Sequence, residues 1–239
     1  MTNNLKKIVL AYSGGLDTST VLKWLQEEYG AEVIACYGDL GQKADLDAVR
    51  AKARRIGASK VYISDLKREF AEKYAFQCLK AGALYQGKYP MSTSISRPIL
   101  AKELVAIAKE EHADAIAHGC TGKGNDQLRF YAAISVLNPD IKILTPLVDW
   151  PMQSRDEQIE YAKSRGIDIP ITAAAPYSLD ENLWGRSIGC GPLEDISTPL
   201  SEEIFQLTKS LRIVSMVRGS PNLEKEETVH GTEENALAG

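Results

Sequence analysis

The residues best suited to chemistry lie in a glycine-rich segment near the N-terminus, AYSGGLDTS at positions 11–19. The segment follows an apolar run rich in β-branched residues and precedes residues with helical spacing, so it joins a predicted strand to a predicted helix. Its paired glycines let the backbone approach an anion closely. Its hydroxyl groups, and the free amides of a helix N-terminus, can donate to phosphate oxygens. The segment therefore predicts a nucleotide-phosphate site, and a pyrophosphate would fit it well.

Asp17 stands out in this segment, because a carboxylate beside bound phosphate is repelled unless it holds Mg²⁺ or accepts a proton. The plainer interpretation is an acidic residue in the first turn of a helix, which stabilises the helix dipole. The surrounding strand, hydroxyl groups and helix favour the functional interpretation, so Asp17 is the predicted catalytic residue.

A second glycine-rich segment, HGCTGKGNDQLRF at positions 118–130, also follows an apolar run and precedes a helical pattern. It is not a Walker phosphate loop, because Lys123 is not preceded by the required glycine spacing and is followed by Gly124. Its polar side chains suit a zwitterionic substrate, and Arg129 offers a bidentate fork to a carboxylate. The alternative interpretation is a glycine-rich turn with a solvated helix start.

Two further segments carry weaker signals. Residues 89–98 crowd a tyrosine, four hydroxyl residues and an arginine together, which usually means a turn and a helix cap, with Arg97 and Pro98 opening the next helix. Ser178 and Ser187 could bind a polar ligand or serve as turn residues. The three histidines have no ligand spacing and the four cysteines include no C-x-x-C pair, so the sequence favours neither a zinc site nor a disulfide framework.

The elements that must position these segments are predicted by alternating patterns. Five short apolar runs predict buried strands, and segments with helical spacing lie between them. This alternation is typical of an α/β fold, a doubly wound, mainly parallel sheet with helices on both faces that resembles a Rossmann fold. The motifs then fall in loops at the carboxyl ends of strands. The predicted strands are 8–12, 32–37, 60–63, 115–118 and 142–147.

We expect three regions along the 239 residues. Residues 1–170 form the nucleotide-binding α/β domain, and residues 171–200 form a loop-rich extension that carries the two serines. Residues 201–239 form a short helix and a disordered tail, because the last 22 residues are polar and lack a periodic apolar face.

Composition narrows the class of protein. The chain is 44% hydrophobic and 25% charged, which is typical of a globular protein. Its formal net charge of −4 predicts no extended nucleic-acid surface, and no apolar run reaches the roughly 20 residues of a membrane span. No secretory signal is evident, so we expect a cytoplasmic protein without a membrane or nucleic-acid partner.

Taken together and in order, these motifs resemble the argininosuccinate synthase family. The likeness covers roughly residues 6–195, the nucleotide-binding domain of that family. The SGGxD loop alone would indicate only the wider class of N-type ATP pyrophosphatases, of the adenine nucleotide alpha hydrolase-like fold, whereas TGKGNDQ and SLDENLWGRS are much more specific. The segments that carry the resemblance are Ala11–Ser19, Asp39–Gln42, Ala83–Tyr85, Thr93–Ser94 with Arg97–Pro98, His118–Phe130 and Ser178–Leu183.

The resemblance implies an ATP-dependent ligation of citrulline and aspartate in arginine biosynthesis. A citrulline adenylate forms first, and the aspartate amine then displaces AMP, so the products are argininosuccinate, AMP and pyrophosphate. ATP and Mg²⁺ are the implied cofactors; no protein ligand for the metal is assigned beyond its position near Asp17. Gly38 stands where the family usually has alanine near adenine, and we expect it to preserve room there.

The implied contacts carry over residue by residue onto this sequence. For ATP they are Ala11, Tyr12, Ser13, Gly14, Gly15, Leu16, Asp17, Thr18, Ser19, Gly38, Gly119 and Lys123; for citrulline Tyr89, Ser94, Asn125, Arg129, Ser178 and Ser187; and for aspartate Thr121, Asn125 and Asp126.

We expect the likeness to stop near Asp195, so that the C-terminal domain of the family is missing. In the family that domain completes the citrulline site and supports a tetramer, which leaves both features open for this chain. Three hypotheses follow: a synthase, an ATP-binding module with little turnover, or another N-type ATP pyrophosphatase such as a tRNA thiolase. Dispersed cysteines and negative charge argue against the thiolase.

Overall fold

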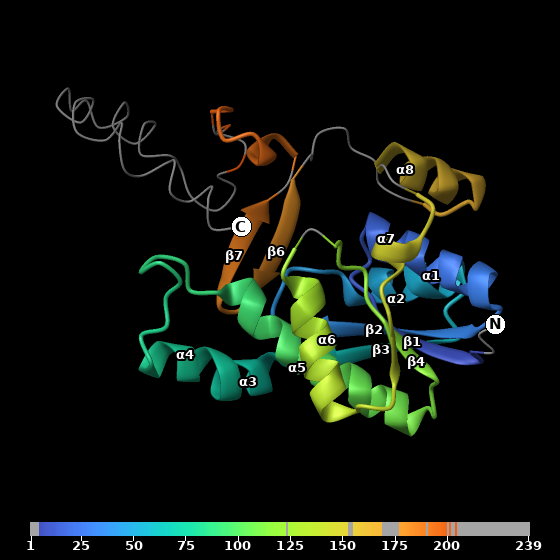
Figure 1. Cartoon of the computed structure of the whole chain (residues 1–239), viewed down its shortest axis with the longest axis horizontal. Helices are drawn as coiled ribbons and strands as arrows, with labels where there is room; N and C mark the ends of the chain where they lie inside the picture. The colour runs from blue at the N-terminus through green and yellow to red at the C-terminus, as the bar shows by residue number, and fades with distance from the viewer. Residues whose placement is uncertain are drawn as a thin grey trace.

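A five-stranded parallel sheet forms the centre of the computed structural model (Figure 1). The structure describes residues 5–122, 124–152, 155–168, 177–189, 191–199, 201 and 204, without the side chains of Arg155 and Glu194. The strand order is β3-β2-β1-β4-β5, and all neighbouring strands run parallel. The strands are β1 Lys7–Ala11, β2 Glu32–Asp39, β3 Lys60–Asp65, β4 Ala115–Ala117 and β5 Lys142–Leu144.

Helices cover both faces of this sheet, which confirms the predicted doubly wound α/β architecture (Figure 1). One apolar layer joins the sheet to α1 and α2, and α7 and α8 contact α1. The other layer joins the sheet to α5 and α6. The bounds are α1 Leu16–Tyr29, α2 Leu46–Ile56, α3 Lys67–Phe70, a π-helical turn Ala71–Ala75, α4 Phe76–Lys80, α5 Ser92–Glu110, α6 Asp126–Leu137, α7 Pro146–Asp149 and α8 Arg155–Ser164.

Strand β1 shows why both layers form. Successive side chains of a strand point to opposite faces, so Ile8 and Leu10 pack with α1 while Val9 packs with α5, and all three are fully buried. Strand β1 has β2 as its neighbour on one side and β4 on the other, so the strand order reverses at β1. Ligands of doubly wound folds bind beyond the strand ends at such a reversal of strand order. The loops after β1 and β4 therefore share the expected ligand crevice.

An antiparallel hairpin, β6 Ser178–Asn182 and β7 Gly185–Gly189, packs against α5. The turn is built by Asn182, whose side-chain oxygen accepts from the amides of Trp184 and Gly185 at 2.9 and 3.2 Å. Its amide group donates to the carbonyl of Ser92 at 2.9 Å. The segment predicted as loop-rich thus contains regular structure, because one asparagine closes the turn and fixes it to the start of α5. A short 3-10 turn, Gly191–Glu194, follows.

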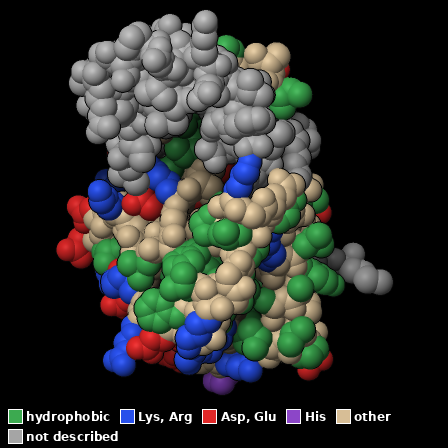
Figure 2. Space-filling view, turned by 90° about the vertical axis from the view of Figure 1, so that its left-hand side faces the viewer, with side chains coloured by type: hydrophobic (Ala, Val, Ile, Leu, Met, Phe, Trp, Pro, Cys, Tyr) green, Lys and Arg blue, Asp and Glu red, His purple; other side chains and the backbone are tan. Residues whose placement is uncertain are grey.

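One face of the molecule exposes several large apolar side chains on α4 and the loop that follows it. Figure 2 shows hydrophobic side chains gathered on that side of the molecule. Phe76, Leu79, Leu84 and Tyr85 are each about half exposed or more. Among the helices that the structure describes, none has the length and hydropathy required to cross a membrane.

Candidate functional site

The loop after β1 forms an open helix N-terminus. Gly14 adopts a positive φ of 80°, and Gly15 is the N-cap of α1 in an extended conformation without a side-chain cap. The hydroxyl groups of Ser13 and Thr18 are 3.0 Å apart, and the Ser13 amide donates to Thr18 Oγ1 at 3.2 Å. Ser13 and Gly15 are exposed. Uncapped amides and two hydroxyl groups at a helix N-terminus are the donors that bind phosphate.

Two residues predicted for this site are more deeply buried than the rest of the loop. Ser19 is fully buried and Tyr12 nearly so, and their hydroxyl groups lie 3.3 Å apart. Burial raises the pKa of Tyr12. The sequence suggested that Ser19 offers its hydroxyl to phosphate, but residue 19 lies one turn into α1 on the side that packs against the sheet. These two buried residues contact each other beneath the exposed residues Ser13 and Gly15 and stabilise the loop.

The loop after β4 lies directly against this helix start. A side chain at Gly119 would place its Cβ atom 2.9 Å from Thr18 Cγ2, so glycine is what permits this close approach. The two glycine-rich segments, 106 positions apart at Ser13 and Gly119, are therefore neighbours at the strand-order reversal. Lys123, predicted for ATP, is outside the described residues, and Thr121 and Asn125 are exposed.

Gly38, near the end of β2, lies against the side chains of Leu100 and Leu66. A Cβ atom there would collide with Leu100 Cδ2 on α5 and lie 3.2 Å from Leu66 Cδ1. The glycine therefore makes room for Leu100, and α5 approaches the strand end as a result.

A charged cluster connects α5, α6 and the hairpin. Arg97 donates from Nε and Nη2 to Asp126 Oδ2 at 2.9 and 2.8 Å, and from Nη2 to Asp180 Oδ1 at 2.9 Å. Arg129 donates to the second oxygen of Asp126 at 2.6 Å. Burial favours a lower pKa for Arg97, but Asp180 and Asp126 outweigh it and hold the pKa above its usual value. Arg97 is thus a fixed positive charge between two carboxylates.

The sequence did not predict that Arg97 lies at the centre of a charged cluster. This arginine was expected to open the helix, whereas α5 begins five residues earlier at Ser92 and contains Pro98. Pro98 is the seventh residue of α5 and has no amide hydrogen, so the Ser94 carbonyl receives no hydrogen bond from the residue four positions later. The arginine therefore lies within α5, where its neighbours on the next elements decide its partners; no local sequence signal contains them.

A hydroxyl cluster lies one turn earlier on α5. The Tyr89 hydroxyl accepts from the Thr93 amide at 3.1 Å, and Thr93 Oγ1 lies 2.6 Å from Ser187 Oγ. Burial favours a higher pKa for Tyr89, but hydrogen bonds with Ser92, Thr93 and Ser187 outweigh it and the pKa is lowered. Tyr89 and Ser187, both predicted for citrulline, are thereby brought together.

The hairpin register explains why both clusters form. Asp180 pairs with Ser187 across β6 and β7, and cross-strand partners share one face of a hairpin. Thr93 and Arg97 are one turn apart and share one face of α5. The two pairs meet. Within the described residues, neither Ser94 nor Ser178 hydrogen-bonds to these clusters through its side chain; Ser94 is half-buried and Ser178 exposed.

His118 directly follows β4, donates its backbone amide to the Leu144 carbonyl of β5, and is fully buried. Its ring stacks on Phe130 at 5.2 Å, and Nδ1 accepts from the Cys120 amide at 3.4 Å. Burial lowers the pKa of His118 to about 4. The imidazole is therefore neutral at pH 7 and carries its proton on Nε2, which has no hydrogen-bond partner among the described residues.

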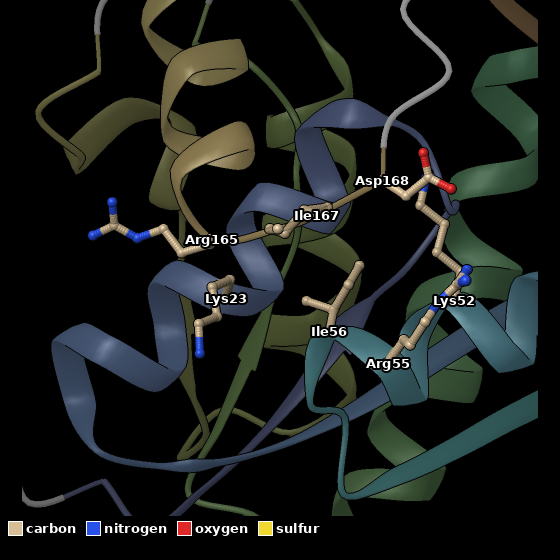
Figure 3. Close-up of a pocket in the computed structure, with 8 residues that line it drawn as sticks. Lys23, Lys52, Arg55, Ile56, Arg165, Ile167 and Asp168 are labelled. Atoms are coloured by element: carbon tan, nitrogen blue, oxygen red, sulfur yellow. The ribbon is translucent and has the colours of Figure 1, made fainter.

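A cavity of about 230 Å³ lies between α1, α2 and the end of α8 (Figure 3). Its lining is rich in cations, and Arg165 is already paired with Glu27 at 3.1 Å. Lys52 connects it to the loop after β1, because its Nζ atom donates to the Gly14 carbonyl at 2.7 Å. The sequence motifs did not include Lys52. The charged residues that line the cavity are Lys23, Lys52, Arg55, Arg165 and Asp168.

Comparisons with known proteins agree with this architecture. Residues 7–168 match the family model described as "Arginosuccinate synthase N-terminal HUP domain", and residues 177–219 match "Arginosuccinate synthase C-terminal domain". The likeness thus continues past Asp195, where we expected it to stop, and part of the C-terminal domain is matched.

Sequence relatives extend this finding. The chain is 56% identical to the argininosuccinate synthase of Geobacillus kaustophilus over 86% of this chain and 50% of that protein. It is 54% identical to that of Bacillus subtilis over 86% of this chain and 51% of that protein. The chain spans about half the length of these relatives. The U34-tRNA thiolase NcsA of Methanococcus maripaludis is 20% identical with a TM-score of 0.47, over 74% of this chain and 62% of that one. The chain belongs to the argininosuccinate synthase family.

Proposed function

We propose that this chain forms the nucleotide-binding part of an enzyme that ligates citrulline and aspartate with ATP. Argininosuccinate, AMP and pyrophosphate are the products. The observation that carries the proposal is the meeting of two features at one end of the sheet. The open helix start after β1 contacts Gly119, and the polypeptide that continues from Gly119 brings Asp126 into the cluster with Arg97 and Asp180.

ATP fits the first of these features. The exposed amides of Gly15 and the first turn of α1, with the hydroxyl groups of Ser13 and Thr18, would hold the pyrophosphate part and stabilise the charge that develops on it. Ala11, Leu16, Gly38 and Gly119 would lie along the nucleoside. Mg²⁺ would neutralise phosphate charge, and Asp17 is the carboxylate of this loop that would hold it or accept a proton.

The two amino acids fit the second feature. Asp126 is negatively charged and held by two arginines, so it is a fixed partner for the ammonium group of aspartate, with Thr121 and Asn125 beside it in sequence. Arg129, Asn125, Tyr89, Ser94, Ser178 and Ser187 would bind citrulline. The ureido oxygen would attack the α-phosphate, and the aspartate amine would then displace AMP. Holding two substrates in a reactive orientation supplies much of the rate acceleration of an enzyme that joins them.

Calorimetric titration of the chain with MgATP, followed by citrulline and an assay for pyrophosphate, tests the proposal. We expect saturable MgATP binding and pyrophosphate release that depends on citrulline. Ser13→Ala should weaken the binding of MgATP, whereas Ser59→Ala should not, because within the part of the chain that the structure describes the Ser59 hydroxyl bonds only the Val33 carbonyl. MgATP binding without pyrophosphate would assign an ATP-binding module. Absence of MgATP binding would contradict the proposal.

A further inference from the structure

A lysine outside the sequence motifs contacts the phosphate loop. Lys52 extends from α2, is half-buried in the cavity, and donates from Nζ to the Gly14 carbonyl at 2.7 Å. The methyl groups of Val49, one turn earlier on α2, lie 3.7 and 4.0 Å from the Cβ position of Gly14. Helix α2 therefore holds the glycine turn through one charged and one apolar contact.

The contact between Lys52 and the Gly14 carbonyl also sets the direction of the Gly15 amide, because the peptide between the two glycines is planar. In a trans peptide the carbonyl of one residue and the amide of the next point in opposite directions. Because Lys52 binds the Gly14 carbonyl on the α2 side, the Gly15 amide must point away from α2. It points toward Ser13, whose Oγ atom lies 3.4 Å away. Gly14 has a positive φ of 80°, a region where glycine has several accessible conformations.

Placing Lys52 in the cavity has an electrostatic cost. Burial lowers the pKa of Lys52, and Arg55 lowers it further, while Asp168 counteracts both. Figure 3 shows Lys52 and Asp168 at the same end of the cavity. A cation that is half-buried beside another cation is retained at the loop by its hydrogen bond to Gly14 and by the opposing charge of Asp168.

We propose that Lys52 is a positioning residue that turns the Gly14–Gly15 peptide so that the Gly15 amide faces the phosphates of ATP. The inference rests on the proposed function, because it requires that the loop after β1 binds those phosphates. Lys52 itself contacts the carbonyl side of the peptide and acts through Gly15.

Two variants and one control separate this role from a general effect of charge. Lys52→Met removes the donor and the charge, and Lys52→Arg keeps both. Lys23→Met removes a lysine from the same cavity that, among the described residues, pairs with Glu27 and bonds no atom of the loop after β1. The binding of MgATP, pyrophosphate and AMP is measured by calorimetry, and hydrogen exchange is measured for the amides of residues 13–17.

We expect Lys52→Met to weaken MgATP and pyrophosphate about tenfold, the usual size for losing a hydrogen bond to a charged group, and to change AMP binding less than twofold. Amide exchange at residues 13–17 should accelerate. Lys52→Arg should recover most of the affinity, and Lys23→Met should resemble the parent chain.

The outcomes distinguish this inference from the proposed function. A parent chain that binds neither MgATP nor pyrophosphate would overturn both. Parent-like binding and exchange in Lys52→Met would overturn the role of Lys52 and leave the proposed function intact. Equal losses for MgATP and AMP, with a lowered melting temperature, would also overturn it by showing a merely structural residue. A loss in Lys23→Met equal to that in Lys52→Met would assign the effect to charge alone.

Discussion

The guanidinium of Arg97 donates two hydrogen bonds to one carboxylate oxygen of Asp126, from Nε at 2.9 Å and Nη2 at 2.8 Å. Arg129 occupies the other oxygen. Both oxygens of Asp126 are therefore fixed by arginines from α5 and from α6 itself. A carboxylate held in this way keeps its direction, which suits recognition of an ammonium group.

Asp126→Asn is expected to lower the free energy of unfolding by about 1–3 kcal/mol, because it weakens charged hydrogen bonds to Arg97 and Arg129 in a largely buried cluster. Urea unfolding measures the change. Asp140→Asn, at an exposed carboxylate in the loop after α6, should change it by less than about 0.5 kcal/mol. Equal effects of the two substitutions would show that the arginine contacts of Asp126 contribute nothing to stability.

Arg129→Lys is expected to impair the binding of citrulline more than that of MgATP, because an ammonium group cannot reproduce the planar fork of arginine. Calorimetry with each ligand measures the two affinities separately. Arg68→Lys is the matched control, at an exposed arginine on α3 whose ion-pair partner is Glu72. If Arg129→Lys loses both ligands equally, the residue supports the fold and does not select citrulline.

The fold was predictable from local patterns, whereas the clusters were not. Short β-branched runs separated by helical segments indicate a parallel sheet, and a glycine-rich loop after the first strand indicates where anions bind. These signals are local because strand burial and helix spacing are written in consecutive residues. The cluster at Arg97 depends on Asp126 and Asp180, 29 and 83 positions away, and no periodicity contains such a pairing.

The same distinction explains Ser19 and Lys52. A motif names Ser19 as a hydroxyl donor, but the packing of α1 against the sheet turns its side chain inward. Lys52 has no motif, and it reaches the Gly14 carbonyl only because α2 packs beside the loop. Residue types predict a chemistry for the site, whereas packing decides which side chains can reach it.

Asp17→Asn is expected to preserve stability within about 0.5 kcal/mol and to weaken the binding of MgATP, because it removes a charge from the loop without changing its shape. Asp47→Asn is the matched control, since Asp47 occupies the same second position of α2 as Asp17 does of α1. Melting temperature and MgATP calorimetry are measured for both. An unchanged affinity in Asp17→Asn would restrict Asp17 to the stabilisation of its helix.

His118 makes stability depend on pH in acid. Its pKa is lowered to about 4 in the folded protein by burial, against an ordinary value of about 6.5 in an unfolded chain. Between these values the unfolded chain binds more protons, so the stability contributed at neutral pH is lost as the pH falls from about 6.5 toward 4. From the two pKa values, the loss between pH 7 and pH 4.5 is about 2 kcal/mol.

His118→Phe is expected to remove this component while retaining a ring to stack on Phe130. Urea unfolding at pH 7 and pH 4.5 should show a decrease in stability that is smaller by about 2 kcal/mol in the variant than in the parent chain. His118→Gln is a second variant that does not titrate and keeps a side-chain oxygen for the Cys120 amide. Other groups titrate in all three proteins, so their contributions cancel in the comparison. The same decrease in all three would mean that His118 titrates with its ordinary pKa, which would contradict its burial without charge.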